Sequence, residues 1–507
     1  SGAVAANVLS DLQIEGLSTA TAGISNLRLG KNAGDAIVSG GNYNVVVGDE
    51  AGTAITTGDK NTLLGFNSGA SITTGIDNIF LGSNSGDALD EGNTNIGIGT
   101  YALSADTTGS LSVAVGDRAL ASQNFTSATN AYNIAVGASA GSSVSTGVDN
   151  TIIGGLAGDA ITTGSSNVAV GSSALSAATT STGSTAVGFE ALNTNTTATQ
   201  LTAVGYQAGK VASAGGGSST YIGYQTGLVA TGGHNTFVGA IAGTSTTSGA
   251  TNVAVGSQAL EKNTTASNNV AVGYQALEEN TTGHGNTAVG TIALDANTTG
   301  IYNDAYGYGA LGLNTTGYSN VAVGSFALSS NTTAANNTAV GYSALELNTT
   351  GTSNVAVGYK ALEANTTGDA NVAVGYQALD ACTTGFNNTA VGTSALSAIT
   401  DGQRNTAVGN VAGASITTGD YNICIGDNAG NDVTTGGQNT VIGACAMCTN
   451  TTGGYNVAVG YQALRTNLDT HYNTAVGYQA LISNTGSNNT AVGFNTGYYN
   501  TTGNSNT

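Results

Sequence analysis

The chain has 507 residues, of which 40% are hydrophobic and only 7% are charged, with 77 Gly, no Pro and no Trp. The net charge is −20 and the nine Lys and Arg are scattered singly, so binding to nucleic acid or to an anionic membrane surface is disfavoured. No apolar run approaches the roughly 20 residues that span a bilayer, so no membrane insertion is expected. Because apolar residues recur at fixed places, the composition indicates a repetitive architecture and not disorder.

The first 25 residues precede the regular pattern. They begin SGAVAANVLSDLQIEG, which has no basic region followed by an apolar block, so this is not an intact secretory signal. We interpret residues 1–25 as a lead or connector segment and predict one continuous repeat array over residues 26–507. Asn506 and Thr507 match the first two residues of another repeat, so the array is expected to be truncated in mid-repeat.

Each repeat carries an "AVG" element, and we call its Gly the anchor. The anchors run from Gly30 to Gly493, and 22 of the 27 intervals between the 28 anchors are seventeen residues long. The largest departure, 21 residues, lies between Gly116 and Gly137. Short β-prone pieces separated by Gly, with no 3.6-residue period, predict an all-β fold. We expect a parallel β-solenoid of about 28 coils of seventeen residues, stacked at ~4.8 Å per coil.

Asn stands four residues before the anchor in 24 of the 28 copies. Stacked Asn amides bond to the same residue above and below, so this column predicts a ladder, with an Asx turn at each strand entry as the alternative reading. The anchors that follow, such as Gly256, Gly273 and Gly290, are predicted turn residues. The ladder positions that we single out are Asn252, Asn269, Asn286, Asn303, Asn320, Asn337, Asn354 and Asn371.

Two columns are predicted to form the core. The residue before the anchor is Val, Ile or Leu in 27 of 28 copies, as at Val255, Val272 and Val289. The residue before that one is usually Ala but accepts Arg28, Phe80, Tyr221 and Phe237, so it is expected to point elsewhere, as strand alternation demands. The second predicted core column lies four residues after the anchor and includes Leu260, Leu277 and Leu294.

This second core column alternates with another position. Four residues after the anchor, 16 copies carry Leu or Met and 12 carry Gly, and 8 of those 12 carry Ile, Leu or Val seven residues after the anchor. We predict that the two positions share one pocket, because overfilling and underfilling a core both destabilise it. One coil buries little apolar surface for the seventeen residues it orders, so packing of several chains in a homotrimer is expected.

The repeat approximates the unit N-x-A-V-G-Y-x-A-L-x-x-N-T-T-G, and its N-x-A-V-G part stands at residues 252–256, 371–375 and 473–477. It resembles repeats in phage tail fibres that end in a self-cleaving intramolecular chaperone of the endosialidase type. It is also similar to the N-S-V-A-I-G repeats in the heads of trimeric autotransporter adhesins. The resemblance covers nearly the whole chain from Asn26 onward, and both families imply trimeric β-rolls outside the cell.

Residues able to perform chemistry are few and dispersed. His234, His284 and His471 lie in separate turns, and no catalytic or zinc grouping follows from them. Acidic residues fit no calcium-loop pattern. No cofactor, metal or enzymatic activity is expected. The Cys residues occupy different columns, so we interpret them as small apolar fillers, with a disulfide or metal set as the alternative: Cys382, Cys424, Cys445 and Cys448.

The surface columns offer two further readings. Tyr follows the anchor in many copies, as at Tyr274, Tyr359 and Tyr376, where rings are expected to stack on each other or, alternatively, on sugars. Thr-Thr pairs such as Thr281 and Thr282 would form hydroxyl rows. Ice-binding solenoids use such rows, but adjacent Thr residues are expected to point to opposite faces of a strand.

Together these features predict a non-enzymatic structural fibre outside the cell, the shaft or host-attachment body of a phage tail fibre in the virion. The expected partners are other copies of the chain, side by side and end to end, and a cell-surface glycan or protein receptor. A bacterial trimeric surface adhesin or extracellular matrix filament is the alternative, and an ice-binding solenoid is a third reading.

Overall fold

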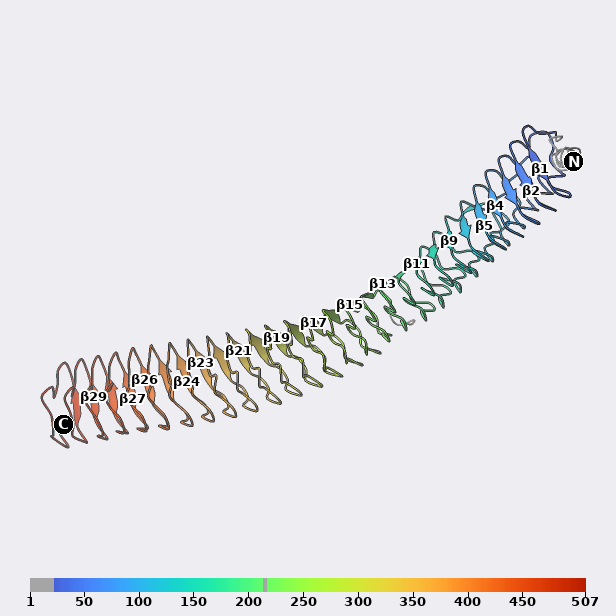
Figure 1. Ribbon diagram of the computed structural model, residues 1–507. Helices are drawn as coiled ribbons and strands as arrows, with labels where there is room; N and C mark the ends of the chain where they lie inside the picture. Colours follow the sequence, from blue (N-terminus) through green and yellow to red (C-terminus); the bar gives the residue numbers. More distant parts are fainter. Residues whose placement is uncertain (1–21, 213–216) are drawn as a thin grey trace, which may run out of the picture. The chain divides into compact units, whose positions relative to one another are not determined.

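The computed structural model describes residues 22–212 and 217–507, so residues 1–21 of the predicted lead segment lie outside the described residues. The chain divides into two compact units, Ser1–Asn252 and Val253–Thr507. Within each unit, nearly every coil contributes one three-residue strand to a stack of parallel strands (Figure 1). No helix occurs among the described residues, and therefore none of them forms an apolar helix long enough to cross a bilayer.

The first unit has thirteen strands in its main stack and two short additional strands, β6 and β8, counted over its described residues. The strands are β1 (Leu27–Leu29), β2 (Val45–Val47), β3 (Thr62–Leu64), β4 (Ile79–Leu81), β5 (Ile96–Ile98), β6 (Gly109–Ser110), β7 (Val113–Val115), β8 (Thr129–Asn130), β9 (Ile134–Val136), β10 (Thr151–Ile153), β11 (Val168–Val170), β12 (Thr185–Val187), β13 (Thr202–Val204), β14 (Thr220–Ile222) and β15 (Thr236–Val238).

The second unit has fifteen strands, one in each successive coil. They are β16 (Val253–Val255), β17 (Val270–Val272), β18 (Thr287–Val289), β19 (Asp304–Tyr306), β20 (Val321–Val323), β21 (Thr338–Val340), β22 (Val355–Val357), β23 (Val372–Val374), β24 (Thr389–Val391), β25 (Thr406–Val408), β26 (Ile423–Ile425), β27 (Thr440–Ile442), β28 (Val457–Val459), β29 (Thr474–Val476) and β30 (Thr490–Val492).

Strand pairing follows the repeat. Val253 of β16 lies opposite Val270 of β17, and Ala254 lies opposite Ala271, so each residue pairs with its equivalent in the next coil. The pairing is parallel within both units. This register confirms the predicted all-β parallel β-solenoid, with about 27 turns spaced roughly 17 residues apart.

The one long interval, between Gly116 and Gly137, is accommodated locally. The longer coil contains β8, which pairs in parallel with β6 of the preceding coil. The main stack continues past the insertion, because β7 still pairs with β9 in the usual register. The insertion therefore adds a small side sheet without breaking the stack of the first unit.

The strands place their side chains opposite to the prediction. In every three-residue strand except β1 the middle residue is buried, as at Ala254, Ala271 and Ala288, which have no exposed surface. The residue before the anchor faces outward, so the prediction that it lies in the core is wrong: Val255 is 36% exposed and Val272 and Val289 are half-buried. Variation in side-chain size along the Ala column is therefore not a sign of exposure.

Glycine in neighbouring columns explains why that variation fits inside. Phe80, Tyr221 and Phe237 all point into the interior, with no exposed surface. A Cβ on Gly227, four residues after its anchor, would lie 2.4 Å from Tyr221 Cδ1. A Cβ on Gly86 would likewise lie 2.5 Å from Phe80 Cζ. Aromatic rings therefore replace Ala where nearby Gly residues leave room.

The two positions that exchange Leu and Ile do share one space. Leu260, Leu277 and Leu294 are fully buried, as predicted, and so is Ile55 in a coil of the other type. In that coil a Cβ on Gly52 would lie 2.8 Å from Ile55 Cδ1. One coil therefore has room for a large side chain at one of the two positions. Leu277 also has a positive φ of 53°, which disfavours Leu by about 1–2 kcal/mol and is offset by its burial.

The anchor column consists of Gly because two requirements coincide there. Gly256, Gly273 and Gly290 have φ values of 139°, 140° and 143°, which L-residues avoid. A Cβ on Gly273 would also lie 2.4 Å from the carbonyl oxygen of Gly290 in the next coil. Any side chain at an anchor would thus force adjacent coils apart.

Candidate functional site

The buried Asn column four residues before the anchor joins each coil to its neighbours. Asn320 donates from its backbone N–H to Asn303 Oδ1 at 3.1 Å and from Nδ2 to the same oxygen at 3.1 Å. Asn320 Nδ2 also donates to the backbone oxygen of Ala334 at 2.8 Å, and Asn320 Oδ1 accepts from the N–H of Asn337 at 3.0 Å. The amide thus bonds to the coil on either side, as the predicted ladder requires.

Every ladder position that we singled out has this environment, since each residue is at most 1% exposed. The backbone N–H groups of seven of them donate to the Asn Oδ1 of the preceding coil at 2.9 to 3.1 Å: Asn252, Asn286, Asn303, Asn320, Asn337, Asn354 and Asn371. The set is Asn252 in the first unit and, in the second, Asn269, Asn286, Asn303, Asn320, Asn337, Asn354 and Asn371.

One gap in this column is repaired from inside the coil. Ser112 stands where an Asn is expected, and Gln123 reaches across the interior to replace the missing amide. Gln123 Nε2 donates to Ser112 Oγ at 2.9 Å and to Asp106 Oδ2 at 2.6 Å. Gln123 Oε1 accepts from Asn133 Nδ2 at 2.9 Å. Burial raises the pKa of the Asp106 carboxyl, although the hydrogen bond from Gln123 acts in the opposite direction.

The structure contains a second amide ladder that the sequence analysis did not identify. Seven residues after the anchor, fully buried Asn residues stack in seven successive coils. Asn314 Nδ2 donates to Asn297 Oδ1 at 2.9 Å, and Asn331 Nδ2 donates to Asn314 Oδ1 at 2.8 Å. The frequent pairing of Asn at this position with Leu three residues earlier was the available signal. The column comprises Asn263, Asn280, Asn297, Asn314, Asn331, Asn348 and Asn365.

The outward face of the strands in the second unit is almost entirely uncharged. First and third strand residues are Val, Ile or Thr in every strand except β19, where they are Asp304 and Tyr306. Several are substantially exposed, for example Val323 at 37%, Val408 at 38% and Ile423 at 39%. A strand with one face in water normally alternates apolar and polar residues, whereas these strands carry apolar residues on both faces. We call this outward strip the sheet face.

Rows of aromatic rings begin immediately after the anchors. Tyr342, Tyr359 and Tyr376 stack in three successive coils, with ring centroids 5.6 and 5.3 Å apart and planes within 12°. Tyr461 and Tyr478 form a similar pair at 5.3 Å. Ring faces within these rows are occupied by neighbouring rings of the same chain, which leaves mainly ring edges for outside contacts.

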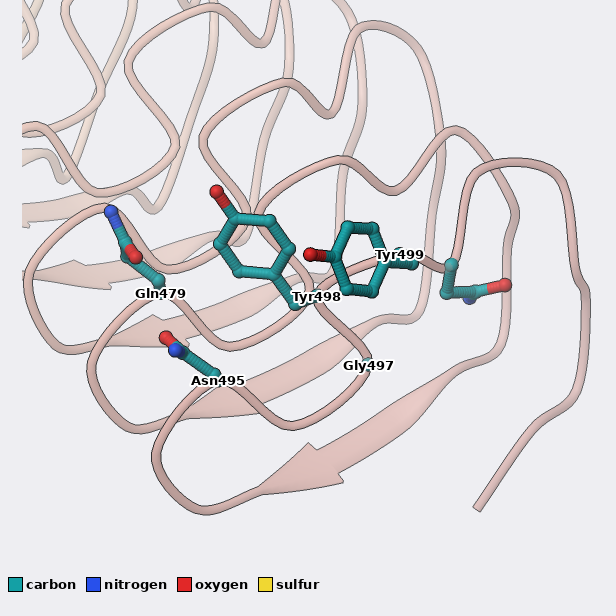
Figure 2. A pocket seen from close by; sticks show the side chains of 6 residues that line it. Gln479, Asn495, Gly497, Tyr498 and Tyr499 are labelled. Atoms are coloured by element: carbon teal, nitrogen blue, oxygen red, sulfur yellow. The ribbon is translucent and has the colours of Figure 1, made fainter.

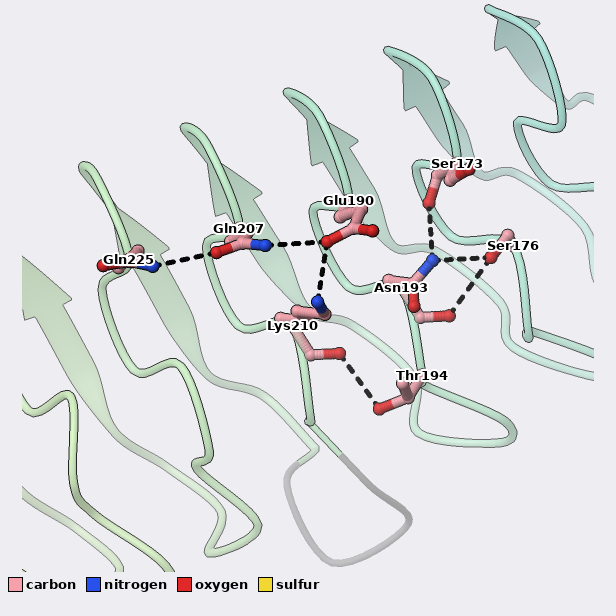
Figure 3. A network of polar contacts seen from close by, with 8 residues as sticks. All are labelled: Ser173, Ser176, Glu190, Asn193, Thr194, Gln207, Lys210 and Gln225. Atoms are coloured by element: carbon pink, nitrogen blue, oxygen red, sulfur yellow. Dashed lines mark hydrogen bonds and ion pairs between the residues drawn. The ribbon is translucent and has the colours of Figure 1, made fainter.

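Polar side chains form comparable rows on the first unit (Figure 3). Gln225 Nε2 donates to Gln207 Oε1 at 2.9 Å, and Gln207 Nε2 donates to Glu190 Oε2 at 2.7 Å. Lys210 Nζ lies 2.7 Å from the same Glu190 oxygen. The hydrogen bonds from Lys210 and then Gln207 hold the pKa of Glu190 below its usual value. Glu190, Gln207 and Gln225 lie at equivalent places in successive coils, Lys210 lies three residues further along its coil, and the contacts assemble no reactive group.

The two members of a Thr-Thr pair lie in different environments. Thr281 Oγ1 donates to the backbone oxygen of Thr298 at 3.0 Å, and Thr298 Oγ1 donates to Thr315 in the same way. The second member of each pair, such as Thr282 or Thr299, is exposed. The first hydroxyl therefore holds coils together.

The four Cys residues have two different roles. Cys445 and Cys448 form a disulfide, so their interpretation as apolar fillers is wrong. They lie two and five residues after one anchor, and the turn between them brings their Cα atoms to 5.0 Å. Comparing Cys positions between coils does not reveal this contact, because both residues belong to the same coil. Cys382 and Cys424 are buried free thiols, and burial raises the pKa of each to about 12.

The remaining titratable residues do not converge. His234, His284 and His471 are exposed in separate coils. Glu261 and Glu278 occupy one column, and burial, followed by the neighbouring Glu261 carboxylate, raises the pKa of Glu278. Over residues 22–212 and 217–507, no group of three or more His, Cys, Asp or Glu is placed to hold a metal ion.

A pocket of about 660 Å³ lies at the last coil of the second unit (Figure 2). Its lining includes Tyr498 and Tyr499, whose rings meet edge to face with their centroids 4.9 Å apart. The other lining residues contribute amides and a glycine, with no carboxylate, imidazole or thiol: Gln479, Asn495, Gly497 and Asn500. The pocket therefore holds no strong acid or base. The chain matches no protein-family model and no curated protein sequence.

Proposed function

We propose that this chain is a non-enzymatic structural element of an extracellular fibre, the shaft or host-attachment body of a phage tail fibre. The observation that carries the proposal is the sheet face, an uncovered apolar strip repeated in every coil of the second unit. Its support is twofold: strands with apolar residues on both faces are typical of sheets covered on both sides, and the repeat resembles those of tail fibres and adhesin heads.

The size of the strip favours a second copy of this chain as its cover. Fifteen strands spaced ~4.8 Å apart, each with three residues of ~3.3 Å, give a strip on the order of 700 Å². Exposed apolar patches on monomers are usually about 300–600 Å², and specific interfaces bury about 800 Å² per partner. Only Asp304 places a charge on the strip, so copies can approach despite the chain's net charge of −20.

We therefore propose a homotrimer in which the sheet faces pack against one another. Three copies fit the resemblance to trimeric β-rolls. The aromatic rows that begin just after the strands would lie near the margin of such an interface, where Tyr is well suited because its ring is apolar and its hydroxyl remains in water.

The test is the mass of the full chain in solution after substitution on the sheet face. Val321→Lys, Val323→Lys, Val355→Lys and Val357→Lys together place four charges on β20 and β22, where the side chains point outward. The matched control places four Lys at exposed second-Thr positions, with Thr282→Lys, Thr299→Lys, Thr316→Lys and Thr333→Lys. Sedimentation equilibrium should give three chains for the control and one for the sheet-face variant.

An unchanged mass for a folded sheet-face variant would contradict the proposed interface. The biological setting needs a separate experiment, in which gold-labelled antibody against this chain is imaged on the native assembly. Label along fibres attached to phage tails supports the proposal, whereas label confined to a cell envelope or its matrix supports the adhesin or matrix-filament alternative.

A further inference from the structure

One exposed column is occupied by residues that its backbone conformation disfavours. The fifth residue before each anchor has a positive φ, and in many coils it is Ser, Asn or Gly, as at Ser319 and Ser353. Asn and Gly suit this conformation, and small polar residues are common in such turns. Over five successive coils of the second unit the column instead holds larger side chains: Arg404, Tyr421, Gln438, Tyr455 and Tyr472.

Neither backbone conformation nor burial favours large side chains at these positions. Tyr421, Tyr455 and Tyr472 have φ values of 60°, 60° and 61°, a conformation that costs a residue with a Cβ about 1 kcal/mol or more. They recover little of that by burial, because they are 46%, 49% and 59% exposed. Ser occupies the same position elsewhere in the unit without loss of the coil. Single Tyr residues also occur in this column, at Tyr43, Tyr132 and Tyr302, so the distinguishing feature of residues 404–472 is the unbroken row of large exposed side chains over five coils.

The side chains are also ordered in advance. The Arg404 guanidinium lies over the ring of Phe386, 5.5 Å from its centroid, and over the ring of Tyr421 at 5.2 Å. Arg404 also donates to the Tyr421 hydroxyl. Gln438 Nε2 donates to the Tyr455 hydroxyl at 3.3 Å, and the rings of Tyr455 and Tyr472 stack at 5.0 Å. We call Phe386, Arg404, Tyr421, Gln438, Tyr455 and Tyr472 the ridge.

Ordered side chains lose little entropy when a ligand binds, which raises affinity without new contacts. Because neighbours cover several of the ring faces, the ridge presents mainly ring edges, hydroxyls, an amide and a guanidinium to solvent. This is a row of hydrogen-bond donors and acceptors interspersed with apolar edges, repeated at ~4.8 Å along the stack. That interval is close to the length of one pyranose ring in an extended chain of sugars.

Charge narrows the class of ligand. Asp401 and Asp469 are exposed in coils of the ridge, and Asp420 directly precedes Tyr421. Hydrogen bonds from Thr451 and Thr452 hold the pKa of Asp469 below its usual value, so it stays ionised. These carboxylates repel polyanions such as acidic capsules and nucleic acids. A neutral, hydroxyl-rich polymer meets no such barrier.

We propose that the ridge is a binding surface for an extended neutral polysaccharide, held along the stack with about one sugar ring per coil. The proposal rests on the proposed role of the chain as an extracellular fibre and names its receptor class. It assigns receptor contact to the side of the coil stack, over residues 386–472, and not to an end.

The test compares three forms of the full chain on immobilised polysaccharides. The ridge variant carries Tyr421→Ser, Tyr455→Ser and Tyr472→Ser. The control variant carries Tyr43→Ser, Tyr132→Ser and Tyr302→Ser, which lie in the same column outside the ridge, with φ values of 59°, 49° and 56°. The probes are neutral bacterial O-chain polysaccharides, with acidic capsular polysaccharides beside them, and binding is measured by biolayer interferometry.

The wild type and the control should bind at least one neutral O-chain with equal affinity, and the ridge variant should bind it at least tenfold more weakly. Absence of wild-type binding to every neutral probe, equal binding by the ridge variant, or stronger binding to acidic capsules would each overturn the proposal. All three forms should sediment with the same mass. A lower mass for the ridge variant would also overturn it, since the ridge would then be a contact between copies, and this outcome would leave the fibre proposal intact.

Discussion

Replacement of Asn320 tests the direction of the hydrogen bonds in the Asn ladder four residues before the anchor. In Asn320→Asp the shape is kept, but the two Nδ2 donors to Asn303 Oδ1 and Ala334 O are replaced by an acceptor. Each lost bond is worth about 1 kcal/mol net, and an unpaired buried charge costs about 3–5 kcal/mol. We expect a local loss of about 5–7 kcal/mol at neutral pH, since the residue is fully buried.

Asn320→Ser should cost less, about 2–3 kcal/mol, because a hydroxyl still offers an oxygen to the N–H of Asn337, as Ser184 Oγ does for Leu201 at 3.3 Å. The control is Asn336→Asp, at an exposed position with φ 62° where Asp is tolerated, and it should change stability by less than ~0.5 kcal/mol. Coils of a repeat protein unfold locally, so the assay is amide hydrogen exchange at Asn337 and its neighbours, combined with thermal unfolding.

The pH dependence gives this prediction its sign. Burial without a donor raises the folded-state pKa of the introduced carboxyl above its unfolded value, so the neutral form is favoured on folding. The loss of stability should therefore be greatest at pH values above the folded-state pKa. It should shrink as the pH falls below that pKa. Asn320→Asp protein as stable as the wild type at pH 7, or less stable at pH 4 than at pH 7, would refute the assigned ladder.

Three further changes probe separate features. Gln123→Glu replaces the donor between Asp106 and Ser112 by a second buried carboxyl, so residues 99–137 should lose about 3–5 kcal/mol of stability at neutral pH. Because the pKa of Asp106 is already raised, that stability should recover on acidification. Hydrogen exchange measured against pH tests this, and a loss independent of pH would contradict it. Gly273→Ala should cost about 3 kcal/mol or more, because of its φ of 140° and its contact with Gly290. Gly155→Ala should be nearly neutral, because no atom lies nearer than 4.0 Å to the added Cβ. Equal shifts in melting temperature would contradict the claim that an anchor tolerates no side chain. Leu379→Gly should cost about 2–5 kcal/mol, because it leaves a cavity. Adding Cys382→Ile should restore about 1–3 kcal/mol, because Ile would fill that cavity as Ile416 does beside Gly413. A double variant no more stable than Leu379→Gly would argue against a shared pocket.

The sequence was most informative where one residue has only one physical solution. The seventeen-residue spacing of anchors predicts the parallel register, because Gly273 must lie directly against Gly290 and tolerates no side chain there. The Asn column was readable for the same reason, since few residues other than Asn both donate and accept at a strand entry. The exchange of Leu four residues after the anchor for Ile seven residues after it also indicated that each coil has room for one large side chain.

The direction in which each strand faces was less accessible. A nearly invariant Val and a more variable Ala are equally consistent with either orientation, because interior volume is shared between columns. Tyr221 fits inside only because Gly209 and Gly227 leave space for its ring. The sequence also gave no sign that the apolar residues before the anchors are uniform because they form an outward strip. The Cys445–Cys448 pairing depends on the turn within one coil, which the repeat spacing does not describe.

The most direct test of the account is the mass of the wild-type chain in solution, by sedimentation equilibrium over a range of concentrations. The account predicts a particle of three times 49.3 kDa. A stable, fully folded particle of 49.3 kDa at all concentrations would show that the sheet face needs no partner, and would contradict the account.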